Sequence, residues 1–151
     1  MKSVAVLARK GGVGKTTCAI HLGVRAEMAG QRVIFFDLDP QRSLTAWFKS
    51  RTAETPILIE TDARRLVGLL RQAATDGYDL AVIDTPPAVT FDTAHVATAV
   101  DMVLIPLRPS ILDIYAVEST AAVVNATKTP ALLVLNSCIP PKETGEAPIY
   151  F

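Results

Sequence analysis

The sequence has few cysteines and no net charge. Only two of its 151 residues are cysteines, Cys18 and Cys138, and neither belongs to a C-x-x-C or Cys/His cluster. Their positions argue against a disulfide scaffold and a zinc site, and they fit a reducing compartment. Fifteen Lys and Arg balance fifteen Asp and Glu, so the chain is neither a basic nucleic-acid coat nor a disordered acidic protein. Any nucleic-acid contact must therefore come from a local patch.

Long apolar runs are absent as well. No run reaches the ~18–20 residues of a membrane helix, and the N-terminus lacks the charged, apolar and small-residue regions of a signal peptide. We therefore expect a cytoplasmic protein that does not enter a membrane. Half of the residues are hydrophobic, and a chain of this length typically forms one domain, so residues 1–151 are predicted to share a single core.

Short apolar runs alternate with longer stretches of helical character. This alternation is typical of repeated βαβ units, and it predicts an α/β fold with a mainly parallel central sheet flanked by helices. The expected strands are residues 3–8, 31–37, 56–60, 79–84, 101–107 and 130–136. The expected helices are residues 15–29, 43–51, 63–75, 93–99 and 112–127, with Asp62 as an N-cap and Gly30 as a C-terminal glycine. Residues 137–151 are rich in proline and are expected to form a loop.

A phosphate-binding loop is predicted between the first strand and the first helix. The glycines of this segment allow backbone N–H groups to turn inward around phosphate oxygens, and the helix N-terminus adds its positive dipole end. Lys15 is expected to reach the β and γ phosphates, Thr16 to bind Mg²⁺ and Thr17 to lie near the α phosphate. A glycine-rich turn without a ligand is the alternative, but packing alone does not explain two lysines and two threonines at this spacing. The whole segment is Lys10, Gly11, Gly12, Val13, Gly14, Lys15, Thr16 and Thr17.

The loop departs from the general pattern G-x-x-x-x-G-K-[ST]. Arg9 stands where that pattern has its first glycine, and Lys10 adds a second lysine directly before the glycines. A lysine at this position is not needed to hold phosphate within one subunit. Lys10 therefore suggests a role across an interface between two subunits.

Carboxylates end two of the expected buried strands. Asp37 and Asp39 lie two residues apart at the end of strand 31–37, and Asp84 ends strand 79–84, before two prolines. Ligands of open α/β sheets bind at the carboxyl ends of the strands. We therefore expect these acids near the phosphates, with Asp84 holding a magnesium-bound water. Solvated loop acids beside a turn proline are the alternative for Asp37 and Asp39. For Asp84 the alternative is a strand that ends at an N-cap-like Asp and a proline break.

Together, these segments resemble the deviant-Walker ATPases, the family that includes the ParA partition proteins, the MinD cell-division proteins and the nitrogenase iron protein. The resemblance covers residues 2–136 and implies a P-loop NTPase fold in which the strand after Tyr78 lies beside the first strand. Residues 43–47 look like a stretch of the small plasmid ParA proteins, and residues 101–110 look like a family strand and loop near the dimer face. The placing of the two cysteines does not match the iron protein, which disfavours that branch.

The resemblance also implies roles for individual residues. Lys10 reaches the nucleotide of the partner subunit in an ATP-bound sandwich dimer, Asp39 orients the attacking water, and Asp37 helps to arrange the magnesium site. Asn136, at the end of the last strand, contacts adenine. The implied catalytic residues are Lys10, Lys15 and Asp39, and the implied magnesium residues are Thr16, Asp37 and Asp84.

We therefore expect a ParA-like ATPase of plasmid or chromosome partition that uses ATP and Mg²⁺. By resemblance, ATP drives homodimerisation, the dimer binds nonspecific DNA on the nucleoid, and a ParB-like centromere-binding protein stimulates slow hydrolysis. By the same resemblance, we expect residues 1–151 to lack the family's C-terminal elements, which complete the adenine pocket and carry dimer and DNA contacts. A truncated, non-hydrolysing nucleotide-binding regulatory module is one alternative. A MinD-like cell-division ATPase is another, and it is disfavoured because no basic amphipathic helix closes the chain.

Overall fold

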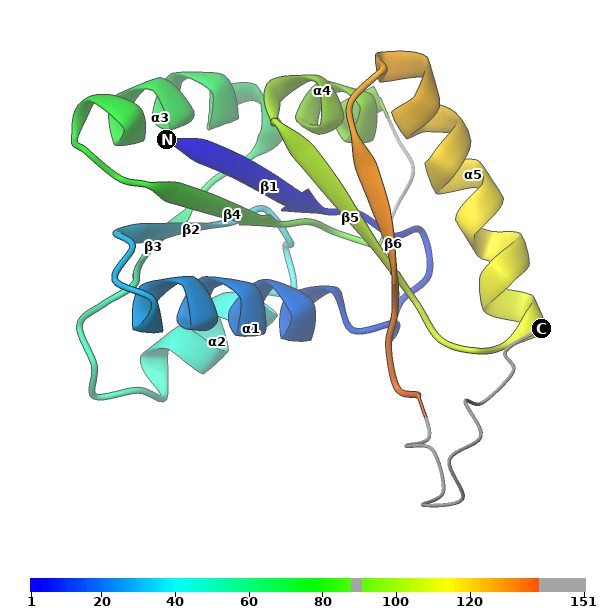
Figure 1. Ribbon diagram of the computed structural model, residues 1–151, viewed down its shortest axis with the longest axis horizontal. Coiled ribbons are helices and arrows are strands. Elements are labelled where there is room, and N and C mark those ends of the chain that lie inside the picture. The colour runs from blue at the N-terminus through cyan, green and yellow to red at the C-terminus, as the bar shows by residue number, and fades with distance from the viewer. Residues whose placement is uncertain (88–90, 139–151) are drawn as a thin grey trace.

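A parallel sheet between two layers of helices forms the body of the protein (Figure 1). The computed structural model describes residues 1–87 and 91–138, with only the backbone of Phe91. The strands are β1 (Lys2–Val6), β2 (Val33–Asp37), β3 (Ile57–Glu60), β4 (Leu80–Asp84), β5 (Met102–Leu107) and β6 (Ala131–Leu135). The helices are α1 (Lys15–Met28), α2 (Ser43–Lys49), α3 (Ala63–Thr75), α4 (Phe91–Ala99) and α5 (Ile111–Thr127). Helices α1 and α2 cover one face of the sheet, and α3, α4 and α5 cover the other.

The strand order is β3-β2-β4-β1-β5-β6, and every pairing is parallel. The expectation that the strand after Tyr78 lies beside the first strand is confirmed, because β4 pairs with β1. From β1 the chain moves to one side of the sheet to form β2 and β3, and later to the other side to form β5 and β6. Open α/β sheets bind their ligands at such a reversal of strand order, outside the carboxyl ends of the strands.

The central strands are covered on both faces, as their unbroken apolar runs predict. All five residues of β2 and all five of β4 are buried. In β2, Val33 and Phe35 join the apolar cluster beneath α1 and α2, whereas Ile34 and Phe36 join the cluster beneath α3 and α4. Since successive side chains of a strand point to opposite faces, two helical layers require apolar residues at every position.

The position of α1 depends on a close approach to the sheet. A β-carbon at Gly23 would lie 2.2 Å from Cζ of Phe35, so only glycine allows the helix to pack at this distance from β2. The helix ends at Gly30, which adopts φ 85° in the expected left-handed conformation. Asp62, the expected N-cap of α3, accepts hydrogen bonds from the backbone N–H groups of Arg64 and Arg65. Both caps are therefore confirmed.

The observed elements agree with the predicted ranges to within two residues at each end. The expected loop over residues 137–151 falls largely outside the described part of the chain. Strand β6 lies at the edge of the sheet, where Leu132, Leu133 and Leu135 are 49–61% exposed. Across residues 1–87 and 91–138, no helix has both the length and the apolar character needed to cross a bilayer.

Candidate functional site

Three neighbouring strands bring the sequence-predicted residues to one edge of the sheet. Strand β1 leads into the phosphate loop, β2 ends at Asp37, and β4 ends at Asp84. In the parallel register, Asp84 stands opposite Val6 on one side and opposite Asp37 on the other. The hydroxyl of Thr85 donates to the Val6 carbonyl over 2.7 Å, which ties the segment after β4 to the start of the phosphate loop.

The backbone of the phosphate loop has a shape that its glycines permit. Gly12 and Gly14 adopt φ of 73° and 96°, and Gly14 is the N-cap of α1. Within the described structure no side chain caps this helix, and β-carbons at Gly11 and Gly12 would have no atom within 4 Å. Among the described residues, the N–H groups of the first turn of α1 therefore have no side-chain partner. This combination of unpaired N–H groups and a helix N-terminus suits an anion.

Lys15 places a buried positive charge at this helix start. Its exposed fraction is 7%, and burial lowers the pKa of its ammonium group, while the charges of Asp84 and Asp39 act in the opposite direction. Among the described residues, no carboxylate lies within 4.0 Å of the Lys15 ammonium group. A buried charge without a direct partner is unfavourable. The arrangement therefore suits a negatively charged ligand in the loop.

Thr16 and Asp84 fit a magnesium site. The Thr16 hydroxyl donates to Oδ2 of Asp84 over 2.7 Å, which joins the first turn of α1 to the end of β4. Within residues 1–87 and 91–138, no group of three or more His, Cys, Asp and Glu side chains is arranged to hold a metal ion. Mg²⁺ commonly binds through one or two protein groups and completes its octahedron with phosphate oxygens and water. These two residues therefore suit Mg²⁺ that arrives with a nucleotide.

The environment of Asp84 favours the uncharged carboxyl group. Its exposed fraction is 0%, and burial raises its pKa from 3.8 to about 6. The hydrogen bond from Thr16 and the charge of Lys15 oppose this shift, and the charges of Asp37 and Asp39 add to it. As the pH rises and Asp84 ionises, the folded protein without ligand therefore loses stability.

We expect Asp84→Asn to stabilise the ligand-free protein increasingly as the pH rises. An acid whose pKa is raised by folding stabilises the native state below its unfolded pKa of 3.8 and loses that contribution through about pH 6. The difference in the free energy of unfolding between variant and wild type should grow between pH 4 and 7, by at most about 3 kcal/mol. Urea denaturation at several pH values measures it. Asp76→Asn, at an exposed carboxylate, is the control, and a pH-independent difference for Asp84→Asn would contradict the interpretation.

Asp37 and Asp39 have different surroundings. Oδ2 of Asp37 accepts from the backbone N–H and the hydroxyl of Thr45, and Oδ1 accepts from the N–H of Asp39 over 3.0 Å. Oδ1 of Asp39 accepts from the N–H of Gln41 over 2.9 Å, and Asp39 is 7% exposed. The sequence groups Asp37 with the magnesium residues, whereas the structure uses both of its oxygens to hold the segment that carries Asp39. Asp37 thus organises the loop from a buried position.

Lys10 is held by α5. Its ammonium group forms an ion pair with Oδ1 of Asp113, while the guanidinium Nε of Arg108 lies 2.9 Å from Oδ2 of the same carboxylate. Arg108, and then Lys10, hold the pKa of Asp113 below its ordinary value. The sequence analysis missed Asp113. The spacing Ser110-x-x-Asp113 predicts only a helix start. In the structure the Ser110 side chain does not cap α5, and the Asp113 carboxylate accepts from the backbone N–H of Arg108.

Asn136 is placed against the phosphate loop. Its Nδ2 donates to the Val13 carbonyl over 2.9 Å. Helix α5 also contacts this segment twice. Besides the pair of Lys10 and Asp113, the backbone N–H of Arg9 donates to the Thr120 hydroxyl over 3.3 Å. Sequence reasoning assigned Asn136 to the base and did not foresee a contact with the loop, because no local pattern joins residues so far apart in the chain.

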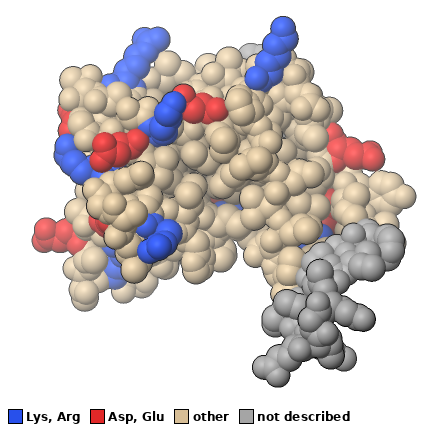
Figure 2. Space-filling view, viewed as in Figure 1, with Lys and Arg blue, Asp and Glu red and all other residues tan. Residues whose placement is uncertain are grey.

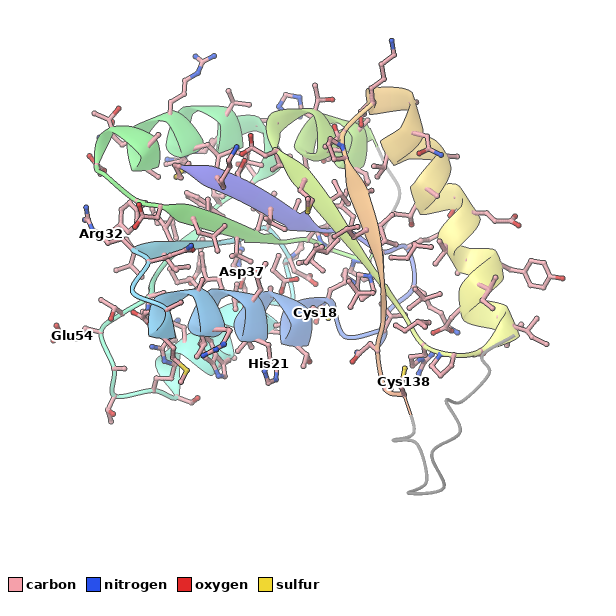
Figure 3. The ribbon with its side chains drawn as sticks, in the orientation of Figure 1. Cys18, His21, Arg32, Asp37, Glu54 and Cys138 are labelled. Carbon is pink, nitrogen blue, oxygen red and sulfur yellow. The ribbon has the colours of Figure 1, made fainter. Side chains whose placement is uncertain are left out.

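Within the described part of the chain, the histidines and cysteines join no cluster that could hold a metal ion. His21 and His95 are exposed, and Figure 3 shows His21 pointing away from the sheet on the outer side of α1. Cys18 and Cys138 are free cysteines on different elements. Charged side chains of both signs are scattered over the face seen in Figure 2. The arginines of α3 (Arg64, Arg65 and Arg71) are exposed, as a solvated helix face predicts.

A cavity of about 290 Å³ lies at the same edge of the sheet, on the side of α3 and α4. It is bordered by Leu7, Leu38, Ala63, Pro86 and Val96, among others. None of the phosphate-loop residues 9–17 lines it. We therefore assign the anion site to the loop and not to this cavity.

Comparison with known proteins agrees with this geometry. The family described as CobQ/CobB/MinD/ParA nucleotide binding domain matches residues 4–143. "Maintenance of carboxysome distribution protein A" of Gloeobacter kilaueensis is 38% identical over 146 residues, which cover 95% of this chain and 66% of that protein. The chromosome-partitioning ATPase Soj of Thermus thermophilus is 30% identical over 151 residues, covering 80% of this chain and 59% of that protein. The chain thus spans about two thirds or less of the length of these relatives.

Solved structures show the same fold. A putative plasmid partition protein from Borrelia burgdorferi, bound to AMPPNP, superposes with a TM-score of 0.74 at 20% identity. The superposition covers 93% of this chain and 76% of that one. Three features indicate the same family. They are the parallel strand order, the phosphate loop after β1 and the sequence match over most of the chain. This protein belongs to the CobQ/CobB/MinD/ParA family of nucleotide-binding domains.

Proposed function

We propose that this chain is a ParA-like ATPase that binds Mg·ATP, dimerises on doing so and hydrolyses the nucleotide slowly. The observation that carries the proposal is the buried Lys15 ammonium group at the start of α1, beside unpaired N–H groups and the linked pair Thr16 and Asp84. Triphosphate supplies the negative charge that this arrangement lacks. Relatives named as partition and distribution proteins support the same class of activity.

The described residues suggest a division of labour in the reaction. Backbone N–H groups of the loop and Lys15 bind phosphate oxygens, and Thr16 and Asp84 hold the magnesium ion. Bound Mg²⁺ neutralises charge that develops on the phosphates. Asp39 orients the attacking water, since it lies beyond the end of β2 and is held by Asp37. Asp37 positions this segment and need not touch the metal.

Dimerisation follows from the placing of Lys10. The residue is not required to bind phosphate within its own subunit, and its side chain is 33% exposed although its ammonium group pairs with Asp113. The proposed role is contact with the nucleotide of a second copy, after exchange of the Asp113 carboxylate for phosphate. The Asp113 carboxylate and the phosphate are both anionic, so the exchange keeps the charge of the Lys10 ammonium group compensated.

We expect Lys10→Ala to separate nucleotide binding from dimerisation. ADP and ATP should bind the monomer with nearly unchanged affinity, because Lys15 and the loop N–H groups remain. ATP-dependent dimerisation and turnover should be lost. Calorimetry for binding and light scattering for mass measure the two effects, with Lys49→Ala, at an exposed lysine of α2, as the control. A loss of ADP affinity as large as that of Lys15→Ala would show that Lys10 serves its own subunit.

DNA and a ParB-like activator complete the proposal. Relatives named for chromosome partition support these partners, as does the resemblance of residues 43–47 to small plasmid ParA proteins. The exposed arginines on α3, including Arg64 and Arg71, are the candidate contacts for phosphate backbones. A membrane-cycling MinD-like role is less well supported.

ATP turnover with and without duplex DNA tests the proposed function. We expect slow, magnesium-dependent hydrolysis that DNA stimulates, and salt should reduce the stimulation because phosphate contacts release counterions. Binding of Mg·ATP without any turnover in either condition would favour the non-hydrolysing regulatory module instead.

Sequence identity supports a second candidate function, the positioning of a protein compartment. The carboxysome-distribution relative is 38% identical to this chain, whereas the partition relative Soj is 30% identical. A positioning ATPase of this type could therefore distribute a protein compartment instead of a replicon. Localisation of the tagged protein in cells that carry labelled plasmids or labelled compartments separates the two, because only the proper cargo becomes clustered when the protein is deleted.

A further inference from the structure

We propose that Asn136 is a positioning residue that fixes the phosphate loop through its side-chain amide. This inference rests on the proposed nucleotide site and adds a role to one of its residues. Asn136 follows the last residue of β6, and its side-chain amide donates to the Val13 carbonyl over 2.9 Å. Val13 is 2% exposed and lies inside the loop.

The planar peptide bond links the contact between Asn136 and Val13 to the orientation of the Gly14 N–H group. The Val13 carbonyl and the Gly14 N–H belong to one trans peptide unit, so they point in opposite directions. Holding the carbonyl toward Asn136 therefore turns the Gly14 N–H away from Asn136. Since the loop binds phosphate through inward N–H groups, the amide of Asn136 preorganises one of these donors. Preorganised donors lose less free energy when the ligand binds.

The amide of Asn136 also packs directly on the loop. A β-carbon at Gly14 would lie 2.0 Å from Nδ2 and 3.2 Å from Cγ of Asn136. Gly14 therefore meets two requirements, since its φ of 96° and this contact both exclude a side chain.

The sheet in turn holds Asn136 in place. Its backbone N–H donates to the Leu107 carbonyl over 2.8 Å, directly after the register pair Leu107 and Leu135. The edge strand β6 is thus connected through one amide to the residue that caps α1. The geometry makes β6 part of the phosphate site.

Inorganic tripolyphosphate, which has no base, is the deciding probe. We expect Asn136→Ala to weaken binding of tripolyphosphate, ATP and GTP by the same factor, about two- to tenfold, as for the loss of one hydrogen bond. Asn136→Asp should weaken all three at least as much, because its carboxylate cannot donate to Val13 and repels phosphate. Asn125→Ala, an exposed asparagine on α5, is the control. Circular dichroism confirms that each variant is folded at the temperature of measurement.

Each result of these binding measurements leads to a different conclusion. Unchanged tripolyphosphate binding with a reduced preference for ATP over GTP would overturn the inference and return Asn136 to the base. Unchanged binding of all three ligands would also overturn it. Lys15→Ala separates the inference from the proposed function. If the wild type binds tripolyphosphate and Lys15→Ala does not, the nucleotide site stands and the Asn136 variants alone decide. If the wild type binds none of the ligands, the proposed function fails and the inference fails with it.

Discussion

Lys15→Ala is expected to abolish measurable ATP binding. Lys15 is 7% exposed and is the first residue of α1. Contact with phosphate is a charge-assisted hydrogen bond, and each such bond contributes ~1.5–3 kcal/mol. Contacts to both the β and γ phosphates therefore correspond to a loss of about 100-fold or more in affinity. Titration calorimetry with Mg·ATP measures the effect.

The same substitution has a second consequence in the absence of nucleotide. The positive charge of Lys15 counters the rise in the pKa of Asp84, so its removal leaves this buried carboxyl group still more difficult to ionise. The variant should remain folded, which thermal denaturation checks. Lys49→Ala removes an exposed lysine instead and should bind ATP like the wild type. ATP affinity in Lys15→Ala equal to that of this control would refute the phosphate-loop assignment.

Asp39→Ala is expected to bind Mg·ATP and to hydrolyse it about 100-fold or more slowly, since a positioned catalytic group of this kind typically contributes ~10²–10⁴ in rate. Asp39 is nearly buried beyond the end of β2, and its carboxylate is close enough to influence the pKa values of Lys15 and Asp84. Any ATP-bound dimer should persist, because its release depends on hydrolysis. Single-turnover measurements of phosphate release, together with light scattering, give both quantities.

Asp39→Asn distinguishes the carboxylate from the turn that it holds. Oδ1 of Asp39 accepts the N–H of Gln41, and an asparagine can retain this bond. If the residue only shapes the loop, Asp39→Asn should restore turnover. If the charged carboxylate orients the water, Asp39→Asn should remain as slow as Asp39→Ala. Wild-type turnover in Asp39→Ala would assign the water to another residue.

Patterns that lie within a few residues carried the prediction of the secondary structure. The strands and helices agree with the sequence to within two residues at their ends, and the caps at Asp62 and Gly30 are as predicted. Such features depend on backbone geometry and neighbouring hydrogen bonds, which the local sequence contains. The phosphate loop is predictable for the same reason, because its glycines, lysines and threonines form one continuous segment between a strand and a helix.

The sequence could not predict the side-chain contacts between distant segments. The pair of Lys10 and Asp113 joins residues 103 positions apart, and the bond of Asn136 to Val13 joins residues 123 positions apart. The hydrogen bonds from Thr45 that use Oδ2 of Asp37 were not foreseen either, although the two residues are only eight positions apart. Each of these contacts changes the interpretation of a candidate residue.

By itself, the sequence determined the class of fold, the phosphate loop and the presence of acids at the ends of two buried strands, because apolar periodicity and turn chemistry are local. The resemblance placed β4 beside β1, and only the tertiary structure showed that β4 also pairs with β2. It inserts β4 between β1 and β2, so that Asp84 faces both Asp37 and the start of the phosphate loop. The physical reason is that strand order is fixed by packing of helices on the two faces and by long-range backbone pairing, and neither is encoded in the spacing of neighbouring residues.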